Sequence, residues 1–510
     1  LPAGTHTLRI EMLPDLPAQP ANFNKQYGFD CFVLSNDGFA PKGADQNGGP
    51  HQLPELPDPK TFGLHLPRTM ALLEGSTPEH RNVVTILFYG QSIVANSHID
   101  LLLTKYLREK YPNAEIRFKN TAIGGYEAPT LHRTCWQDLY CENPDLVVFH
   151  DYGGETDGTY EEMMKGIQDN LVAEVLSWTH HVDNFGTGID KQRDASAVFL
   201  KEMGAKYHYE MVDLRVLWKE MLRTTHLPEQ TFLVDQIHLN TKGSAALLDI
   251  LAPHFVANPA AGDGWKKRVV DLPLDGEANP PGVTFDAAAW THVPGGLVAK
   301  GTAPLRIAFT GNRLDLCGLF PPDAAPTAKA GTAKILLDGK APSTLRETLT
   351  ARRSTIVPGG WWPAVTRVVV ADNAVPEKVT LHFRDLAPDG SSFAFDAVGS
   401  VSGDEGTGKP GVPFTAKSGR WSIAAEDLAL DKLKKITKKD LPPTLDVEFP
   451  VESMSLDAWS PRRPPKPGYS NQDVVVRSWT NGPHVVEIVP NGDGPVGVAK
   501  AVAYAPGPRD

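Results

Sequence analysis

The spacing of hydrophobic and polar residues changes twice along the chain. Up to about residue 75, alternating runs at 5–12 and 29–35 predict β-strands, and the stretch after them is rich in Pro, Gly and Asn, as in a linker or a covering loop. Between about 82 and 256, short hydrophobic runs alternate with segments of helical period. From about 260 onward the helical period disappears and short β-type runs return between turn residues.

The middle segment gives the most regular set of expected elements. Strands are expected at 83–89, 115–120, 145–150, 173–179 and 209–212, and helices at 93–111, 160–170, 195–203 and 242–255. Strands joined through helices run parallel, with helices on both faces of the sheet. The pattern therefore predicts a three-layer α/β domain.

The final segment is expected to consist of strands. Short runs between turn signals predict one or two β-sandwiches, with strands at 304–309, 333–337, 367–370, 379–383 and 474–478. We therefore expect three parts: residues 1–75 with an N-terminal β segment and linker, 76–258 with the α/β domain, and 259–510 with the sandwich region.

A weak internal repeat bears on how the sandwich closes. Residues 4–11, 377–383 and 482–489 have the same form, and a second β run follows each copy. Each copy is either a hairpin that closes a jelly-roll-like sandwich or a chance similarity between amphipathic strands. One hairpin alone is unstable, so the first copy would complete a sheet of the C-terminal half or belong with chain that precedes residue 1.

Composition and charge narrow the function classes. The 510 residues include 50 Lys and Arg against 61 Asp and Glu, a net charge of −11, with no basic block that would favour nucleic acid. No apolar run approaches the roughly 18 residues of a membrane helix. The four Cys form no CxxC pair or zinc-type spacing. Cys135 and Cys141 either form a disulfide or lie on one helix, which would hold them about 9 Å apart, beyond disulfide reach. We expect no nucleic-acid partner, no membrane span and no structural metal, and the oligomeric state has no signal.

Candidate chemistry begins after the first strand of the middle segment. Ser92 follows Gly90 and Gln91 directly after the run at 83–89, and residues at such a strand end lie in the crevice where open α/β sheets bind ligands. The start of the next helix also favours negative charge that develops on its hydroxyl. Ser92 is a candidate nucleophile, or else only the cap of that helix.

A second feature lies late in the same segment. Asp235 and His238 stand three residues apart in a loop that leads into the last expected helix. At this spacing the carboxylate can hold one imidazole nitrogen while the other takes a proton from a nucleophile. A turn in which Asp235 only caps the helix is the simpler alternative. A hydroxyl nucleophile needs a base that a third group orients, and Ser92, His238 and Asp235 offer that set.

Four short blocks, in this order, resemble those of the SGNH (GDSL-type) hydrolases: Gly90-Gln-Ser92, Asn120-Thr-Ala-Ile-Gly-Gly125, Pro144-Asp-Leu-Val-Val-Phe and Asp235-Gln-Ile-His238-Leu-Asn. The resemblance covers about residues 82–256 and implies a flavodoxin-like parallel sheet. It implies Ser92 as nucleophile, His238 as general base and then acid, and Asp235 as its orienting carboxylate. It also implies the backbone N–H groups of Ser92 and Gly125 as oxyanion donors. Such chemistry needs no cofactor.

Two positions depart from the family pattern. Gln91 precedes the nucleophile where the family usually has Asp, a change also found in sugar-deacetylating relatives. Gly154 stands where the third block usually has an Asn that donates to the oxyanion, and losing such a donor typically costs about 3–4 kcal/mol. The Gly154 backbone N–H, Tyr152 and His150 are candidate replacements.

The third block is also rich in acids. A solvated loop explains such a run, but its place at a strand end gives Gln91, His150 and Glu155 a candidate role in binding sugar hydroxyls. A carboxylate pair drawn from Asp151, Glu155 and Asp235 would instead serve a glycosidase on the same scaffold.

A metal held by His150, Asp151, Asp235 and His238 has no ligand-spacing motif behind it, and we expect none. The remaining His residues, including His180, His181 and His208, follow no pattern and are expected at the surface or as hydrogen-bonded interior groups.

Trp361 and Trp362 stand together in a Pro-Gly-Gly-Trp-Trp-Pro loop of the β-rich part. Their rings suit stacking on pyranose faces, which makes them candidate substrate-binding residues. A structural role, filling a sandwich or docking it on the α/β domain, is the more common fate of large aromatic side chains and is the one we favour.

The favoured function is ester hydrolysis at Ser92 that removes acetyl or other acyl groups from a polysaccharide or oligosaccharide. The carbohydrate substrate is expected by analogy with modular carbohydrate-active enzymes that carry β-sandwiches. Such an enzyme would act outside the cytoplasm, secreted or periplasmic, an expectation drawn from the function and not from a signal sequence. A glycosidase or other non-esterase enzyme on the same scaffold is the first alternative. A carbohydrate-binding protein with a decayed catalytic domain is the second.

Overall fold

The computed structural model describes residues 55–509 apart from 185–186, 277, 321–328 and 357–358. The strands expected at 5–12 and 29–35 lie outside the described residues, as does the first copy of the repeat.

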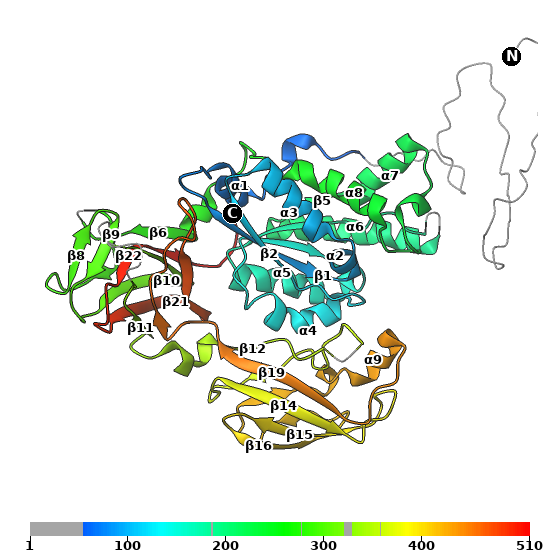
Figure 1. The fold of residues 1–510 in the computed structure, drawn as a ribbon. Helices are drawn as coiled ribbons and strands as arrows, with labels where there is room; N and C mark the ends of the chain where they lie inside the picture. The colour runs from blue at the N-terminus through cyan, green and yellow to red at the C-terminus, as the bar shows by residue number, and fades with distance from the viewer. Residues whose placement is uncertain (1–54, 185–186, 277, 321–328, 357–358, 510) are drawn as a thin grey trace, which may run out of the picture. The chain divides into compact units, whose positions relative to one another are not determined.

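The α/β part is built on a five-stranded parallel sheet in the order β2-β1-β3-β4-β5 (Figure 1). This is the flavodoxin-like order, in which the direction of winding reverses between β1 and β3. The strands are β1 Val83–Gly90, β2 Glu115–Asn120, β3 Leu146–His150, β4 Glu174–Trp178 and β5 Glu210–Val212. All five expected strands of the middle segment are confirmed.

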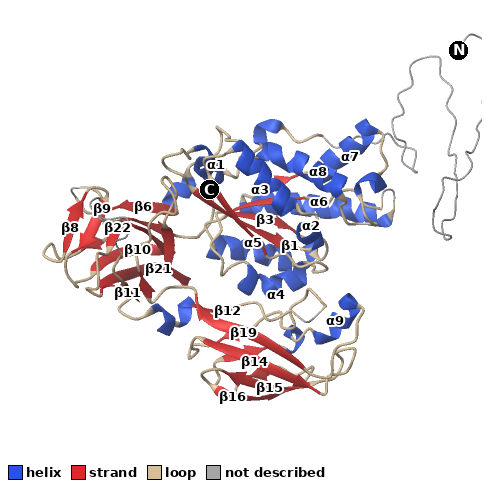
Figure 2. Cartoon of the chain, viewed as in Figure 1, coloured by secondary structure: helices blue, strands red, loops and turns tan. Residues whose placement is uncertain are grey.

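Helices cover both faces of this sheet (Figure 2). Successive strand residues point to opposite faces. Ile86 and Phe88 therefore share a core with α1, α3, α7 and α8, while Leu87 and Tyr89 share a core with α4, α5 and α6. The helices are α1 Pro67–Glu74, α3 Ile99–Lys110, α4 Ala128–Asp138, α5 Thr159–Asn170, α6 Gly188–Tyr207, α7 Leu214–Thr225 and α8 Thr241–Leu251. The expected three layers are confirmed.

Several helices differ from the sequence-based expectation. The helix expected at 93–111 is divided into α2, Ser92–Asn96, and α3, with His98 between them in a left-handed conformation at φ 57°. Asn and Ser compete with the helical backbone for hydrogen bonds, which favours a break there. Helix α4 was foreseen only as a helix between Cys135 and Cys141, whereas it begins at Ala128 and ends at Asp138. Pro129 lies in its first turn, where proline is tolerated. Of the helices in the described part of the chain, none is long and apolar enough to cross a membrane.

The described residues that follow the α/β part form three antiparallel sheets. The nine-stranded sheet contains β6 Val269–Pro273, β7 Val283–Thr284, β8 Trp290–Val293, β9 Gly296–Ala299, β10 Leu305–Gly318, β11 Ala333–Leu337, β20 Ala458–Trp459, β21 Gln472–Pro490 and β22 Gly497–Tyr504. The five-stranded sheet contains β12 Leu349–Ala351, β14 Glu377–Arg384, β15 Ala394–Gly399, β16 Gly403–Gly408 and β19 Leu445–Ser453. The third sheet has three strands, β13 Val369–Val370, β17 Phe414–Thr415 and β18 Trp421–Ile423.

The five- and three-stranded sheets, with helix α9 Leu430–Thr437, form an insertion within the nine-stranded sheet. Strands β11 and β20 flank this insertion in sequence and pair with each other, Ala333 opposite Trp459. We call residues 345–453 the inserted β unit. Two separate groups of antiparallel strands agree with the expected β-rich accessory region, while the jelly-roll form stays a prediction.

The repeat has two different outcomes. Its copy at 377–383 lies in β14, which pairs with β15 as a hairpin, as expected. The copy at 482–489 does not form a hairpin with the next strand, because β10 lies between β21 and β22. Strand β21 is continuous through both runs that the sequence separated, and it pairs with β10 along both of its halves.

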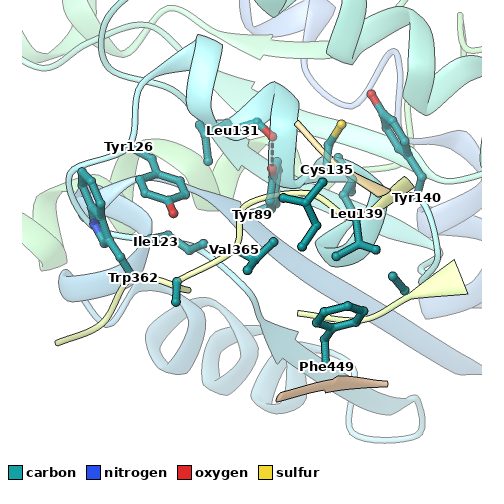
Figure 3. Packing of buried hydrophobic residues seen from close by; sticks show 14 of the residues in the cluster. Tyr89, Ile123, Tyr126, Leu131, Cys135, Leu139, Tyr140, Trp362, Val365 and Phe449 are labelled. Atoms are coloured by element: carbon teal, nitrogen blue, oxygen red, sulfur yellow. Dashed lines mark hydrogen bonds between the residues drawn. The ribbon is translucent and has the colours of Figure 1, made fainter. Parts of the chain in front are cut away.

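The inserted β unit shares its hydrophobic core with the α/β part. Tyr126 and Leu131 belong to the same cluster as Trp362, Val365 and Phe449, and Figure 3 shows Trp362 beside Tyr126. This side of the α/β part is therefore covered by chain from the β-rich region.

Candidate active site

The site forms at the carboxyl ends of β1 and β3, where the strand order reverses. Gly90 ends β1 opposite His150 of β3 at φ 139°, and a Cβ there would lie 2.1 Å from the His150 carbonyl oxygen. Glycine therefore lets the chain turn sharply into α2 while it stays against β3. Gln91 caps α2, because its Oε1 accepts the Ile93 N–H at 2.9 Å. Ser92 is the first residue of that helix.

The structure brings the three residues of the expected catalytic set together. The Ser92 hydroxyl oxygen lies 2.9 Å from His238 Nε2, and His238 Nδ1 lies 2.8 Å from Asp235 Oδ2. The other carboxylate oxygen of Asp235 accepts the backbone N–H groups of Ile237 and His238, each at 2.8 Å. These two bonds hold the carboxylate in place, with its other oxygen beside the imidazole of His238.

The charge on Asp235 follows from these contacts. Partial burial alone would raise its pKa, but the His238 backbone N–H, the imidazole and the Ile237 N–H outweigh burial and lower the pKa to about 2. The ionised carboxylate accepts the Nδ1 proton of His238 and leaves Nε2 as the acceptor that faces Ser92. The His238 side chain is 38% exposed and that of Asp235 54% exposed, so the pair lies at the surface.

Ser92 has a second acceptor within reach. Its hydroxyl lies 2.7 Å from Gln91 Oε1, which the Ile93 N–H holds in place. One hydroxyl carries one proton, so Gln91 Oε1 and His238 Nε2 compete for it. The amide nitrogen of Gln91 then points the other way, to His150 Nδ1 at 2.8 Å.

A buried chain of hydrogen bonds continues behind Gln91. His150 Nε2 lies 3.4 Å from His180 Nδ1, and His180 Nε2 lies 2.7 Å from Glu155 Oε1. Because Gln91 Nε2 can only donate, each imidazole accepts at Nδ1 and donates at Nε2, and Glu155 accepts at the end. The chain therefore has one consistent direction with both imidazoles neutral.

The pKa shifts agree with this direction. Burial lowers the pKa of His150 well below its usual range, and it also lowers that of His180 against the opposing effect of Glu155. Burial alone would raise the pKa of Glu155, but the hydrogen bond and charge of His180 outweigh it and lower the pKa to about 2. Glu155 is ionised and holds the chain at its inner end.

Three residues with expected substrate-binding roles are buried. Gln91, His150 and Glu155 are 2%, 0% and 4% exposed and take part in the hydrogen-bond chain behind Ser92, so their contact with a substrate stays a prediction. Asp151 is also buried, and burial together with the charge of Glu155 raises its pKa well above the usual range. The Tyr152 hydroxyl, an expected oxyanion donor, is turned to the Asp183 carboxylate.

Of the two glycines expected as oxyanion donors, Gly125 lies beside Ser92 and Gly154 does not. A Cβ on Gly124 would lie 3.6 Å from Ser92 Cβ, so the Gly124–Gly125 peptide is beside the nucleophile. Gly154 packs instead against the start of α4, where a Cβ would lie 2.8 Å from Pro129 Cδ. The sequence reasoning missed Asn96, whose Nδ2 lies 3.6 Å from the same position at Gly124. Its i+4 spacing from Ser92 on a helix could have revealed it.

Trp361 and Trp362 meet the site from the inserted β unit. Their indole nitrogens donate to the same acceptor, the Gly124 carbonyl oxygen, at 2.8 and 2.6 Å. Trp362 is 8% exposed and packs edge-on against Tyr126, whereas Trp361 is 48% exposed. For Trp362, these contacts fit the structural role, in which it docks the β-rich part on the α/β part. Trp361 lies beside the site and remains about half exposed.

Among the residues that the structure describes, no three or more His, Cys, Asp or Glu side chains form a group that could hold a metal ion. Cys135, Cys141 and Cys317 are free and buried.

The chain resembles SGNH-type hydrolases in the order of its site motifs, and the solved structures similar to it include several hydrolases. One is a two-domain esterase active on acetylated mannans, co-crystallized with mannopentaose, at 13% identity over 88% of this chain and 96% of that chain, with a TM-score of 0.33. Another is an acetylxylan esterase from Geobacillus stearothermophilus, at 17% identity over 37% of this chain and 98% of that chain, with a TM-score of 0.31. A third is an α/β hydrolase from the metagenome of Lake Arreo, Spain, at 14% identity over 36% of this chain and 99% of that chain, with a TM-score of 0.32.

No family model matches the chain, and no curated protein matches it.

Proposed function

We propose that this protein is a serine-dependent ester hydrolase that removes acetyl or other acyl groups from a polysaccharide or oligosaccharide. One observation carries the proposal: the unbroken hydrogen-bond chain from Ser92 through His238 to Asp235, at 2.9 and 2.8 Å. A hydroxyl, an imidazole in the accepting tautomer and an ionised carboxylate in that order make a serine nucleophilic.

The geometry supports a two-step acyl transfer. His238 Nε2 takes the proton of Ser92 as the serine oxygen bonds to the acyl carbon. The carbonyl oxygen becomes an oxyanion beside the N–H groups of Ser92 and Gly125, with the Asn96 amide as a third nearby donor. Collapse breaks the bond to the sugar oxygen, which takes the proton from His238. Water then loses a proton to His238, attacks the acyl-serine and releases the acid with Ser92 restored.

The substrate class rests on Trp361. Trp361 is 48% exposed and its indole nitrogen reaches the Gly124 carbonyl oxygen beside Ser92. A tryptophan in such a place can offer the flat face of its ring to the C–H side of a pyranose. An acyl group on such a ring would then be presented to Ser92. An enzyme of polymers like these acts outside the cytoplasm, and a secreted or periplasmic location stays a prediction.

The test is acetate release from acetylated mannan, acetylated xylan and a small aryl acetate. Wild type is compared with Ser92→Ala and with Ser97→Ala, which removes a hydroxyl one turn further along the chain. The proposal expects release by wild type and by Ser97→Ala, and none above background by Ser92→Ala. Release that persists in Ser92→Ala would refute the serine mechanism.

The glycosidase alternative is weakened by the burial of its carboxylates. Glycoside hydrolysis needs two carboxyl groups that flank the scissile bond. Asp151 and Glu155 are buried at 2% and 4% exposure, and Asp235 is bound to His238. A binding protein with a decayed site would have no need for the intact chain from Ser92 to Asp235.

A further inference from the structure

Two indole N–H groups hold one peptide of the site. Trp361 and Trp362 both donate to the carbonyl oxygen of Gly124, and the next N–H along the chain, that of Gly125, belongs to the same peptide unit. In a planar trans peptide the C=O and N–H bonds point in opposite directions. Anchoring the carbonyl on one side therefore fixes the direction of the Gly125 N–H on the other.

The Gly124–Gly125 segment needs such an anchor. Both residues lack a Cβ, and Gly125 adopts φ 83°, so the backbone itself restricts the rotation of this peptide little. Within the described residues, none accepts a hydrogen bond from the Gly125 N–H. The Gly124 carbonyl thus sets the direction of the Gly125 N–H, which remains available to an oxyanion.

Trp362 is the anchor that packing holds in place. Trp362 is buried, with its ring centroid 4.7 Å from that of Tyr126, and a Cβ on Gly125 would lie 3.2 Å from its Cζ2. A β-bridge joins Ile356 to Pro363, the residue directly after Trp362. The inserted β unit therefore reaches the site through the buried side chain of Trp362.

We propose that Trp361 and Trp362 are positioning residues, through which the inserted β unit sets the oxyanion donor of the α/β part. Two donors on the Gly124 carbonyl also polarise the peptide, and this strengthens its N–H as a donor. The inference rests on the proposed ester hydrolysis and deepens it: the β-rich region contributes to the chemical step itself and not only to holding polymer.

The test uses Trp361→Phe, Trp362→Phe and the double variant, each of which keeps an aromatic ring but removes the N–H. The substrate is a small aryl acetate, which has no sugar ring to stack. Losing an oxyanion donor outright costs about 10²–10³-fold in kcat. We expect kcat to fall about tenfold in each single variant and about 10²-fold in the double variant, with KM within about twofold of wild type. Trp290→Phe is the matched control, because its indole donates to Ala303 O at 2.8 Å in the nine-stranded sheet.

Unchanged kcat, a change in KM alone, or a loss no larger than that of Trp290→Phe would overturn the proposal. A second readout does not depend on activity: hydrogen exchange at the amides of Ile123 and Tyr126, which bond to Gly90 O at 2.8 Å and Ile123 O at 3.3 Å. Exchange should be faster in the double variant and unchanged in Trp290→Phe. If wild type shows no Ser92-dependent hydrolysis, the proposed function fails, and exchange alone then decides whether the tryptophans anchor the peptide.

Discussion

The substitution Asp235→Asn tests the imidazole tautomer on which the site depends. The Oδ1 atom of Asp235 accepts two backbone N–H groups, from Ile237 and His238, at 2.8 Å each. In the variant this position must keep an oxygen, because an amide NH₂ there would face two donors. The NH₂ is therefore forced toward His238 Nδ1, which must then accept.

The size of the effect follows from that forced orientation. With Nδ1 accepting, the imidazole proton moves to Nε2 and points at Ser92, so His238 can no longer take the serine proton. The same change of tautomer in other serine hydrolases costs about 10⁴-fold in kcat, or about 5.4 kcal/mol at 1.36 kcal/mol per tenfold. The Asp235 side chain is 54% exposed, so water can relieve part of the effect, and we expect a loss of about 10³–10⁴-fold.

The assay is steady-state hydrolysis of an aryl acetate at pH 7.5 by wild type, Asp235→Asn and Asp235→Ala. The Ala variant leaves His238 free to adopt either tautomer, so Asn should cost at least as much as Ala. KM should change little, because Asp235 does not touch the substrate. An Asn variant that keeps more than a tenth of the wild-type kcat would refute the tautomer reasoning, as would an Asn variant clearly faster than Ala.

Three further predictions concern buried groups. Glu155→Ala removes the acceptor that the buried His180 imidazole N–H shares with the Gly153 backbone N–H. This should lower the free energy of unfolding by about 1–3 kcal/mol, measured by urea titration, with aryl acetate hydrolysis retained, and abolished hydrolysis would favour a direct catalytic role. Arg353→Ala removes the ion-pair partner of the buried Asp138, at 2.8 Å, and should lower the free energy of unfolding by about 3–5 kcal/mol. The double variant Arg353→Ala/Asp138→Asn should recover part of this loss, and no recovery would contradict the ion-pair account. Burial lowers the pKa of His181 to about 4, so the stability that its neutral form contributes is present above pH ~6.5 and is lost as the pH falls toward 4. The melting temperature of wild type should therefore fall relative to that of His181→Gln between pH 7 and 4.5. A difference in melting temperature that stays constant over this range would contradict the prediction.

Local patterns in the sequence were sufficient for the elements that frame the site. The run at 83–89 reads as a buried parallel strand, so the position of Ser92 at its end follows from hydrophobicity alone. Asp235 and His238 lie three residues apart, and a contact at that range can be foreseen from a turn. The order of the parallel strands is the one that the family resemblance implied, whereas hydrophobic periodicity alone indicated only their parallel direction.

Contacts between distant segments could not be foreseen. Trp361 and Gly124 are 237 positions apart, and nothing near either residue marks the carbonyl as the acceptor of two indoles. The sequence allowed two interpretations of His150 and Glu155, a solvated loop or a strand end that faces the crevice. Only the position of His180, brought by the end of β4, shows that these side chains satisfy one another in the interior. Strand β21 was divided because Asn481, Gly482 and Pro483 read as a turn, whereas pairing with β10 keeps the strand extended through them.

The most direct test of the central claim is covalent trapping of the nucleophile. Wild type, Ser92→Ala and Ser97→Ala are incubated with an aryl alkylphosphonate ester, and adducts are found by intact mass and peptide mapping. A phosphonate mimics the tetrahedral intermediate and bonds to an activated serine as the aryloxide leaves. We predict one adduct, on Ser92, in wild type and Ser97→Ala, and none in Ser92→Ala. An unlabelled wild type that still releases acetate, or an adduct on any other residue, would contradict the account.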